Sequence, residues 1–165
     1  MKAAIRSKYG PPDVISIEDV PVPIPKAHEI LVRVYATTVN RTDCAVLTGK
    51  PFVIQFFTGL GKPKSPTTGT DFAGVIESIG KNVTTFTVGD KVWGFNDQGL
   101  ATHAQYVVIS TKEAVLKMPE QISYEQAAAS AEGALDRSEI PFRKNPGSIR
   151  ICGEGPKAGE CDPYF

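Results

Sequence analysis

The sequence predicts a mainly β fold, in which short strands close into a barrel or pack as a sandwich. Two observations predict it. Glycine (15) and proline (13) make up about 17% of the 165 residues, against a background of about 12%, and this excess favours many short elements joined by turns. Runs rich in β-branched residues also recur before residue 120 with turn residues between them, which is typical of all-β domains.

The strongest expected strand is the run 29–38, which is dense in β-branched and aromatic residues. Pro21, Pro23 and Pro25 precede it and enforce an extended crossing, because each proline fixes φ and removes a ladder donor. Gly74, inside the run 72–79, indicates a bulge or a barrel corner. In chain order, the expected strands cover residues 2–7, 14–20, 29–38, 72–79, 91–95, 105–110 and 114–118.

Helical signals are few. Residues 42–48 can form one or two turns after a threonine or aspartate cap. Ser123 and Gln126 form a capping box, in which the hydroxyl serves one free amide and the glutamine reaches back to the other. The alanine-rich run that follows predicts a helix that ends near Gly133.

The amino-acid composition changes at residue 135, after which glycine and proline are frequent and apolar residues are sparse. We therefore expect two parts. Residues 1–134 form the folded domain, and residues 135–165 form an irregular Gly/Pro-rich tail with one short strand at 148–152.

Charge and cysteine usage exclude several function classes. The 18 basic and 18 acidic residues cancel, which argues against a nucleic-acid or anionic-membrane surface. No stretch reaches the ~18 apolar residues of a membrane span. Cys44, Cys152 and Cys161 make an odd, sparse set that suits a reduced compartment, so we expect a cytoplasmic protein with neither a nucleic-acid nor a membrane partner.

One run carries a specific resemblance. Residues 69–94 read GTDFAGVIESIGKNVTTFTVGDKVWG, with five glycines (Gly69, Gly74, Gly80, Gly89 and Gly94) where the corners of a small barrel demand residues without a Cβ. This run resembles the signature of the medium-chain dehydrogenases/reductases. Residues 36–43 and 103–129 resemble the flanking cofactor-facing turn and the exit toward the cofactor domain. Within that family, the chain is most similar to the zinc-independent quinone oxidoreductase branch.

The resemblance covers residues 1–134 and implies the GroES-like catalytic domain, a partly open β-barrel with a few short helices. The family's second half, a Rossmann domain, has no counterpart here. Gly153, Gly155 and Gly159 imitate its glycine-rich turn, but Pro156 interrupts that turn and no helix can follow. We therefore expect NADPH in the intact family and no nucleotide bound by this chain alone.

The same resemblance bears on zinc. Zinc-dependent members of the family place Cys, His and Cys around a catalytic metal, and the matching positions here are Asn40, Thr70 and Glu132, with the neighbouring carboxylate kept as Asp71. An amide and a hydroxyl are poor zinc ligands. His103 is interpreted as a surface or turn residue. We therefore expect no metal.

Without a metal, hydride delivery favours conjugated acceptors such as quinones or α,β-unsaturated carbonyls. The resemblance implies that Asn40 offers its amide to the nicotinamide ribose or to the acceptor oxygen, and that Asp43 orients the turn. The alternative is that both side chains only bond the backbone of their own turn, as Asx residues often do.

An aromatic run lies between that turn and Gly69. Phe52, Phe56 and Phe57 either line the acceptor side of the cleft, as the resemblance implies, or form an ordinary packing cluster. Cys44 is interpreted as a small core residue, because the adjacent carboxylate of Asp43 would raise its pKa and disfavour a nucleophile.

Two hypotheses on function follow. The first is the catalytic-domain portion of a zinc-independent NAD(P)H-dependent oxidoreductase, truncated and inactive as this chain alone. The second is a non-enzymatic GroES-like module that mediates self-association or binds a partner. Because loss of a cofactor domain would expose apolar surface near Asn40 and Ala127, we also expect a homodimer or higher oligomer.

Overall fold

The computed structural model describes residues 1–96 and 101–136 of the protein. Most of these residues lie in strands and short helices, and one turn of 3-10 helix spans Pro12–Val14. The strands are β1 (Lys2–Arg6), β2 (Ile15–Asp19), β3 (Glu29–Ala36), β4 (Asp71–Ile79), β5 (Lys91–Phe95), β6 (Tyr106–Ser110) and β7 (Ala114–Lys117). The α-helices are α1 (Arg41–Thr48), α2 (Ile54–Thr58) and α3 (Tyr124–Asp136).

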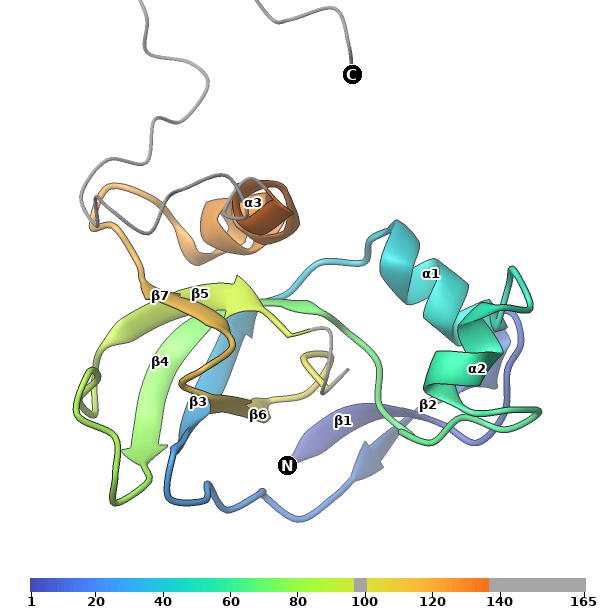
Figure 1. The fold of residues 1–165 in the computed structure, drawn as a ribbon, viewed down its shortest axis with the longest axis horizontal. Coiled ribbons are helices and arrows are strands. Elements are labelled where there is room, and N and C mark those ends of the chain that lie inside the picture. The colour runs from blue at the N-terminus through green and yellow to red at the C-terminus, as the bar shows by residue number, and fades with distance from the viewer. Residues whose placement is uncertain (97–100, 137–165) are drawn as a thin grey trace, which may run out of the picture.

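The strands form two antiparallel sheets. Five of them pair in the order β6-β3-β4-β5-β7, and this sheet curls into part of a barrel (Figure 1). β1 and β2 pair separately, and single bridges at Ala3 and Ile5 tie this ribbon to the loops before β6 and β4. The predicted mainly β, GroES-like fold is confirmed, and each strand starts and ends within two residues of its expected bounds.

The core lies inside the curl of the larger sheet. Successive side chains of β3 and β4 point to opposite faces of the sheet, and those that point into the curl, among them Ile30, Val32, Phe72 and Ile76, are buried together. Burying each such side chain contributes about 1.5–3 kcal/mol. The cluster consists of Ile30, Val32, Phe72, Ile76, Phe86, Val92, Val107, Ile109 and Val115.

The opposite face of the sheet is covered by α3 (Figure 1). Its small side chains allow close approach, and Ala127, Ala128 and Ala131 are fully buried against Ala73 and Trp93. The predicted capping box is confirmed: Gln126 N–H donates to Ser123 Oγ (3.3 Å) and Ser123 N–H donates to Gln126 Oε1 (2.9 Å). The expected end near Gly133 is wrong, since the helix continues to Asp136. One helical glycine costs only about 1 kcal/mol, which packing of this face offsets.

α1 and α2 lie beside the β1-β2 ribbon rather than on the larger sheet (Figure 1). The buried guanidinium of Arg6 in β1 donates from Nη1 to the carbonyl oxygens of Val46 and Leu47 at the end of α1. Burial lowers the pKa of Arg6, but an arginine stays charged. A cation at a helix C-terminus is stabilising, so Arg6 attaches α1 to β1.

The signature glycines are explained in two different ways. Gly69 has a φ of 98°, in the left-handed region that favours glycine. The φ of Gly74 does not lie in that left-handed region, but a Cβ at this position would overlap the carbonyl oxygen of Arg33 on β3. The register between β3 and β4 also shifts between Val34 and Ala36, so the extra residue is on β3, opposite Gly74 and Ala73, and not at Gly74 itself. The same close approach of a neighbouring backbone explains Gly80 and Gly94.

Two further expectations concern the ends of the described chain. The predicted tail, residues 135–165, with its strand at 148–152, lies outside the described residues apart from the last two residues of α3. Within residues 1–96 and 101–136, none of the helices has the length and apolar character that crossing a bilayer requires.

Replacing Gly74 with alanine should destabilise the protein by about 3 kcal/mol, because the new Cβ must push β3 and β4 apart at a backbone contact. Urea unfolding followed by Trp93 fluorescence measures the change. Gly61 is the matched control, since nothing lies within 4 Å of a Cβ there. Its φ of 71° strains an added side chain, but asparagine tolerates this region best, so Gly61→Asn should cost less than Gly74→Ala. Equal losses in the two variants would contradict the steric explanation.

The turn before β5 should add an acid-sensitive contribution to stability. A hydrogen bond from Lys117 Nζ (2.8 Å), and then one from the Thr87 N–H (2.9 Å), lower the pKa of Asp90. Because the pKa of Asp90 is lower in the folded protein than in the unfolded chain, its carboxylate stabilises the fold at pH values above the unfolded pKa of about 4. This stabilisation is lost as the pH falls through the pKa of Asp90 in the folded protein. Asp90→Asn should therefore be less stable at neutral pH and show a shallower loss below about pH 4. If thermal unfolding showed the same loss of stability below about pH 4 in the parent and in Asp90→Asn, the prediction would be contradicted.

Candidate active site at the start of α1

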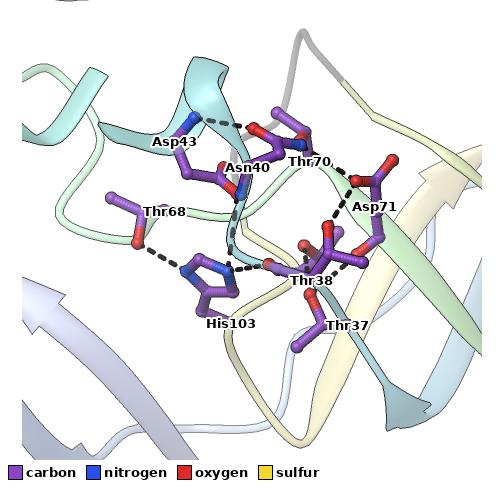
Figure 2. A network of polar contacts seen from close by, with 9 residues as sticks. Thr37, Thr38, Asn40, Asp43, Thr68, Thr70, Asp71 and His103 are labelled. Atoms are coloured by element: carbon purple, nitrogen blue, oxygen red, sulfur yellow. Dashed lines mark hydrogen bonds and ion pairs between the residues drawn. The ribbon is translucent and has the colours of Figure 1, made fainter. Parts of the chain in front are cut away.

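Three segments distant in sequence meet where β3 ends. They are the stretch from the end of β3 through the first turn of α1, the segment leading into β4 and the loop before β6. Each contributes hydrogen-bonding side chains, and Figure 2 shows them converging on one network. The labelled residues are Thr37, Thr38, Asn40, Asp43, Thr68, Thr70, Asp71 and His103.

Asn40 and Asp43 form a reciprocal capping box. Asn40 Oδ1 accepts from the N–H of Asp43 (2.9 Å), and Asp43 Oδ2 accepts from the N–H of Asn40 (3.1 Å). Asn40 has an extended backbone, the usual N-cap conformation. The helix thus begins one residue earlier than expected and its cap is Asn40, not a threonine. An N-cap asparagine is about as good as serine, and an acidic N3 residue also interacts favourably with the helix dipole.

Asp71 is the most heavily constrained side chain of the network. Its carboxylate is buried, and its Oδ2 accepts from Asn40 Nδ2 (2.9 Å) and from the Thr38 hydroxyl. Its main-chain carbonyl accepts from the Thr37 hydroxyl (2.8 Å). The other carboxylate oxygen, Oδ1, is buried without a hydrogen bond from any described residue. A buried anion with one unsatisfied oxygen costs free energy that the fold must offset elsewhere.

His103 joins the loop before β6 to the same network. Its Nε2 lies 2.7 Å from the carbonyl oxygen of Thr38, and its Nδ1 lies 2.8 Å from Thr68 Oγ1. A carbonyl can only accept, so Nε2 donates to Thr38, and Nδ1 shares its hydrogen bond with the Thr68 hydroxyl. Nε2 also lies 3.8 Å from Asp43 Oδ2. Of the two interpretations of His103, a surface or a turn residue, the surface one is wrong, because its side chain is only 13% exposed, whereas the residue does lie at a bend of its loop.

Two of the three residues at the positions that hold zinc in zinc-dependent members of the family are bonded to each other. Asn40 Nδ2 donates to Thr70 Oγ1 (2.8 Å), and Thr70 is fully buried. Glu132, the third matching position, lies within α3. Throughout the described ranges, no three His, Cys, Asp or Glu side chains lie close enough together to hold a metal ion.

The other expected site residues lie apart from this network. Phe52, Phe56 and Phe57 are in and just before α2, and each is more than half exposed, so they form no core cluster. Phe52 and Phe56 make only an edge-to-face pair, with ring centroids 5.7 Å apart. Cys44 is exposed. Its interpretation as a core residue is wrong, because the first turn of α1 turns Asp43 inward and the next residue outward.

Sequence reasoning missed the threonines and His103. A weak signal existed: Thr37-Thr38 lies within the segment 36–43, and Thr67-Thr68 directly precedes the segment 69–94, both of which carry the resemblance. Threonine is also an ordinary strand residue, so only the tertiary contacts reveal its role. Thr102 belongs to the same group, since its buried hydroxyl lies 3.2 Å from that of Thr37.

Comparison with known proteins agrees with this geometry. The alcohol dehydrogenase GroES-like domain matches residues 26–120, which include every residue of the network. The chain belongs to this family. Human quinone oxidoreductase is 34% identical to it over 131 residues, which cover 78% of this chain and 37% of the human protein. The chain therefore spans little more than a third of the curated relatives' length.

Solved members of this GroES-like family have the same architecture. The quinone oxidoreductase of Coxiella burnetii superposes with a TM-score of 0.72 at 28% identity, covering 85% of this chain and 45% of that one. The Escherichia coli quinone oxidoreductase, solved with NADPH, superposes with a TM-score of 0.71 at 25% identity, covering 87% and 41%. The predicted membership of the quinone oxidoreductase-like dehydrogenases is confirmed.

Replacing Asn40 with alanine should lower the free energy of unfolding by about 2–4 kcal/mol. Loss of the N-cap accounts for about 1 kcal/mol, and removing one donor from the buried Asp71 carboxylate adds about 1–3 kcal/mol. Asn40→Ser is the matched control, because serine keeps the cap but is too short to serve Asp71. Asn40→Ser should lose only the contribution from the hydrogen bond to Asp71. Urea unfolding measures the stability of both variants, and two variants as stable as the parent would contradict the role of Asn40 in the network.

Proposed function

We propose that residues 1–134 form the substrate-side catalytic domain of a zinc-independent, NADPH-dependent oxidoreductase that reduces conjugated acceptors such as quinones or α,β-unsaturated carbonyls. Similarity to quinone oxidoreductases over the whole polar network supports the reaction class. The relative solved with NADPH supports the cofactor. A cytoplasmic location is part of the proposal and rests on cysteine usage.

Independence from zinc rests on one observation, which carries the proposal. At two of the three positions where zinc members of the family hold the metal, this chain has an amide and a hydroxyl bonded to each other at 2.8 Å. Neither group provides the thiolate or imidazole that zinc prefers. A simple ketone would therefore lack a Lewis acid, whereas a conjugated acceptor is already electron-poor at the carbon that receives hydride.

The orphaned Oδ1 of Asp71 fits a cofactor at this network. It is an acceptor without a donor, beside Asn40, and a hydroxyl group such as that of a ribose is a suitable partner. When bound, NADPH supplies the hydride. The chain's own residues orient the reacting groups: the capping box fixes the turn, Thr38 and Asn40 hold Asp71, and His103 anchors the carbonyl of Thr38.

Asn40 is the proposed ligand-contacting residue and Asp43 the residue that positions it. Both Nδ2 hydrogens of Asn40 are used, by Thr70 and Asp71, so contact with the ribose or the acceptor oxygen requires the exchange of one of these bonds. Bonds to a carboxylate are about twice as strong as neutral ones. The bond to Thr70 is therefore the one to be exchanged.

Phe52, Phe56 and Phe57 are proposed as the aromatic wall of the acceptor side. Exposed aromatic faces suit flat conjugated molecules, because offset or edge contacts between rings add about 0.5–1.5 kcal/mol beyond burial. Their exposure in this chain supports their availability to a ligand.

A chimera tests the reaction. Residues 1–134 are joined to the part of human quinone oxidoreductase that follows its matched segment, and oxidation of NADPH is followed with a soluble quinone. The chimera should turn over, and a chelator should leave the rate unchanged. The 165-residue chain alone should not turn over, since it spans 37% of the relatives' length. An inactive chimera that still binds NADPH would favour the non-enzymatic interaction module.

In the same chimera, Asn40→Ala should lower kcat by about a hundredfold, as loss of one oriented amide donor typically does. Val88→Ser changes an exposed residue in the turn before β5 and serves as the control with unchanged kcat. An Asn40→Ala chimera with parental kcat would limit Asn40 to its capping role.

A further inference from the structure

Four side chains form a continuous stack between the larger sheet and the start of α3. The rings of Tyr35 on β3 and Tyr124 on α3 lie nearly parallel, with centroids 4.9 Å apart and 16° between their planes. The guanidinium carbon of Arg33 lies 5.4 Å from the centre of the Tyr35 ring, and Lys91 Nζ lies 5.9 Å from the centre of the Tyr124 ring. At these distances a cation is attracted to a ring face. We call these four residues the tyrosine stack.

The tyrosine stack is held by ring faces and charges alone. Within residues 1–96 and 101–136, neither Arg33 nor Lys91 forms an ion pair. The hydroxyl groups of Tyr35 and Tyr124 likewise make no hydrogen bond to a described residue. Burial, and then the neighbouring Tyr35, raise the pKa of Tyr124, so this ring stays neutral. Phenylalanine could therefore replace either tyrosine without loss of the stack.

The rest of the α3 face that meets the sheet is smooth. Its buried residues are Ala127, Ala128 and Ala131. The crossing angle of packed elements is set by ridges of side chains that enter grooves, and methyl groups provide only low ridges. Between residues 124 and 131, Tyr124 is the one large apolar side chain of the helix. The angle of α3 on the sheet therefore depends on how Tyr124 is held.

Tyr35 reaches Tyr124 because it is the extra residue of the bulge in β3. Val34 pairs with Gly74 and Ala36 with Ala73, so Tyr35 has no partner of its own on β4. Neighbouring residues of a regular strand point to opposite faces, but a bulge redirects a side chain. Tyr35 and Ala36 consequently both contact the α3 side, Tyr35 through the stack and Ala36 through the alanine cluster.

The same end of β3 holds the polar network. Directly after Tyr35 and Ala36, the Thr37 hydroxyl donates to the main-chain carbonyl of Asp71 (2.8 Å) and the Thr38 hydroxyl donates to its carboxylate. The tyrosine stack thus connects the first turn of α3 to the strand end that holds Asp71. A tilt of α3 that displaces Tyr35 would displace these donors as well.

We propose that Tyr35 and Tyr124 are positioning residues, whose stack sets the angle of α3 relative to the polar network. In the chimera described above, the cofactor-binding part is joined at residue 134, within α3. The stack then determines how that part faces Asn40 and the acceptor. This effect on the reaction rests on the proposed function, whereas the orientation of α3 by the stack does not.

Distances between two spin labels test the orientation of α3 in the 165-residue chain, without a redox readout. One label is attached to Cys44, which is exposed on α1, and the other to Ala129→Cys, at an exposed position of α3. Cys152→Ser and Cys161→Ser remove the other thiols. The intact stack should give one narrow distance distribution. Tyr35→Thr should broaden and shift it, because the stack is lost while threonine keeps the strand propensity.

Further variants assign the effect to the stack. Tyr124→Leu should broaden the distribution as Tyr35→Thr does, although leucine still fills space beside Trp93. Tyr35→Phe and Tyr124→Phe should keep it narrow. Tyr106→Thr is the matched control, since this tyrosine pairs with Arg33 from β6 but takes no part in the stack. Thermal melts check that each variant is folded. A parental distribution in Tyr35→Thr and Tyr124→Leu, equal broadening in Tyr106→Thr, or broadening in the phenylalanine variants overturns the proposal.

The chimera tests the effect on the reaction. Tyr35→Thr should lower kcat by about tenfold to a hundredfold, since a misplacement of about 1 Å can cost a hundredfold. The Kd for NADPH should stay unchanged, because this chain alone is not expected to bind the nucleotide, and Tyr35→Phe should keep the parental kcat. A Tyr35→Thr chimera with parental kcat overturns the positioning role in the reaction. A parental chimera without turnover contradicts the proposed function instead, and the distance measurements still decide whether the stack orients α3.

Discussion

The buried carboxylate of Asp71 is the constraint on which the candidate active site depends. An anion removed from water must be compensated by donors, and here both come from the segment that joins β3 to α1: the hydroxyl of Thr38 and the amide of Asn40. This segment and the start of β4 cannot separate without exposing a charge that has lost its partners. The oxygen left over, Oδ1, accepts no hydrogen bond from a described residue, so a donor from outside can serve it.

The fold brings these segments together through backbone contacts that only certain residues permit. β4 approaches β3 at Gly74 more closely than a Cβ allows, and Asp71 begins that same strand. Arg6 attaches the far end of α1 to β1, so the helix is held at both ends, by a cation at its C-terminus and by the Asn40-Asp43 box at its N-terminus. The stability of the barrel and the geometry of the site therefore share the same residues.

The features that could be predicted were those that depend on residues close together in the sequence. Strand periodicity and the Ser123 capping box depend on neighbours a few residues away, and both are confirmed. The zinc positions were located by resemblance, but their contact with each other was not foreseen. Cys44 and His103 were misjudged because burial depends on segments dozens of residues distant: Cys44 is exposed, while His103 is held by Thr38 and Thr68.

By itself, the sequence determined the mainly β architecture, the family and the Ser123-Gln126 cap, because hydrophobic period, turn residues and caps act over short distances. Only the tertiary structure decided which polar groups are buried together and which apolar groups are left outside. The Phe52–Phe57 segment shows the reason most clearly. An aromatic run is compatible with a core, a cleft or an exposed face, and its burial is set by the elements that pack around it.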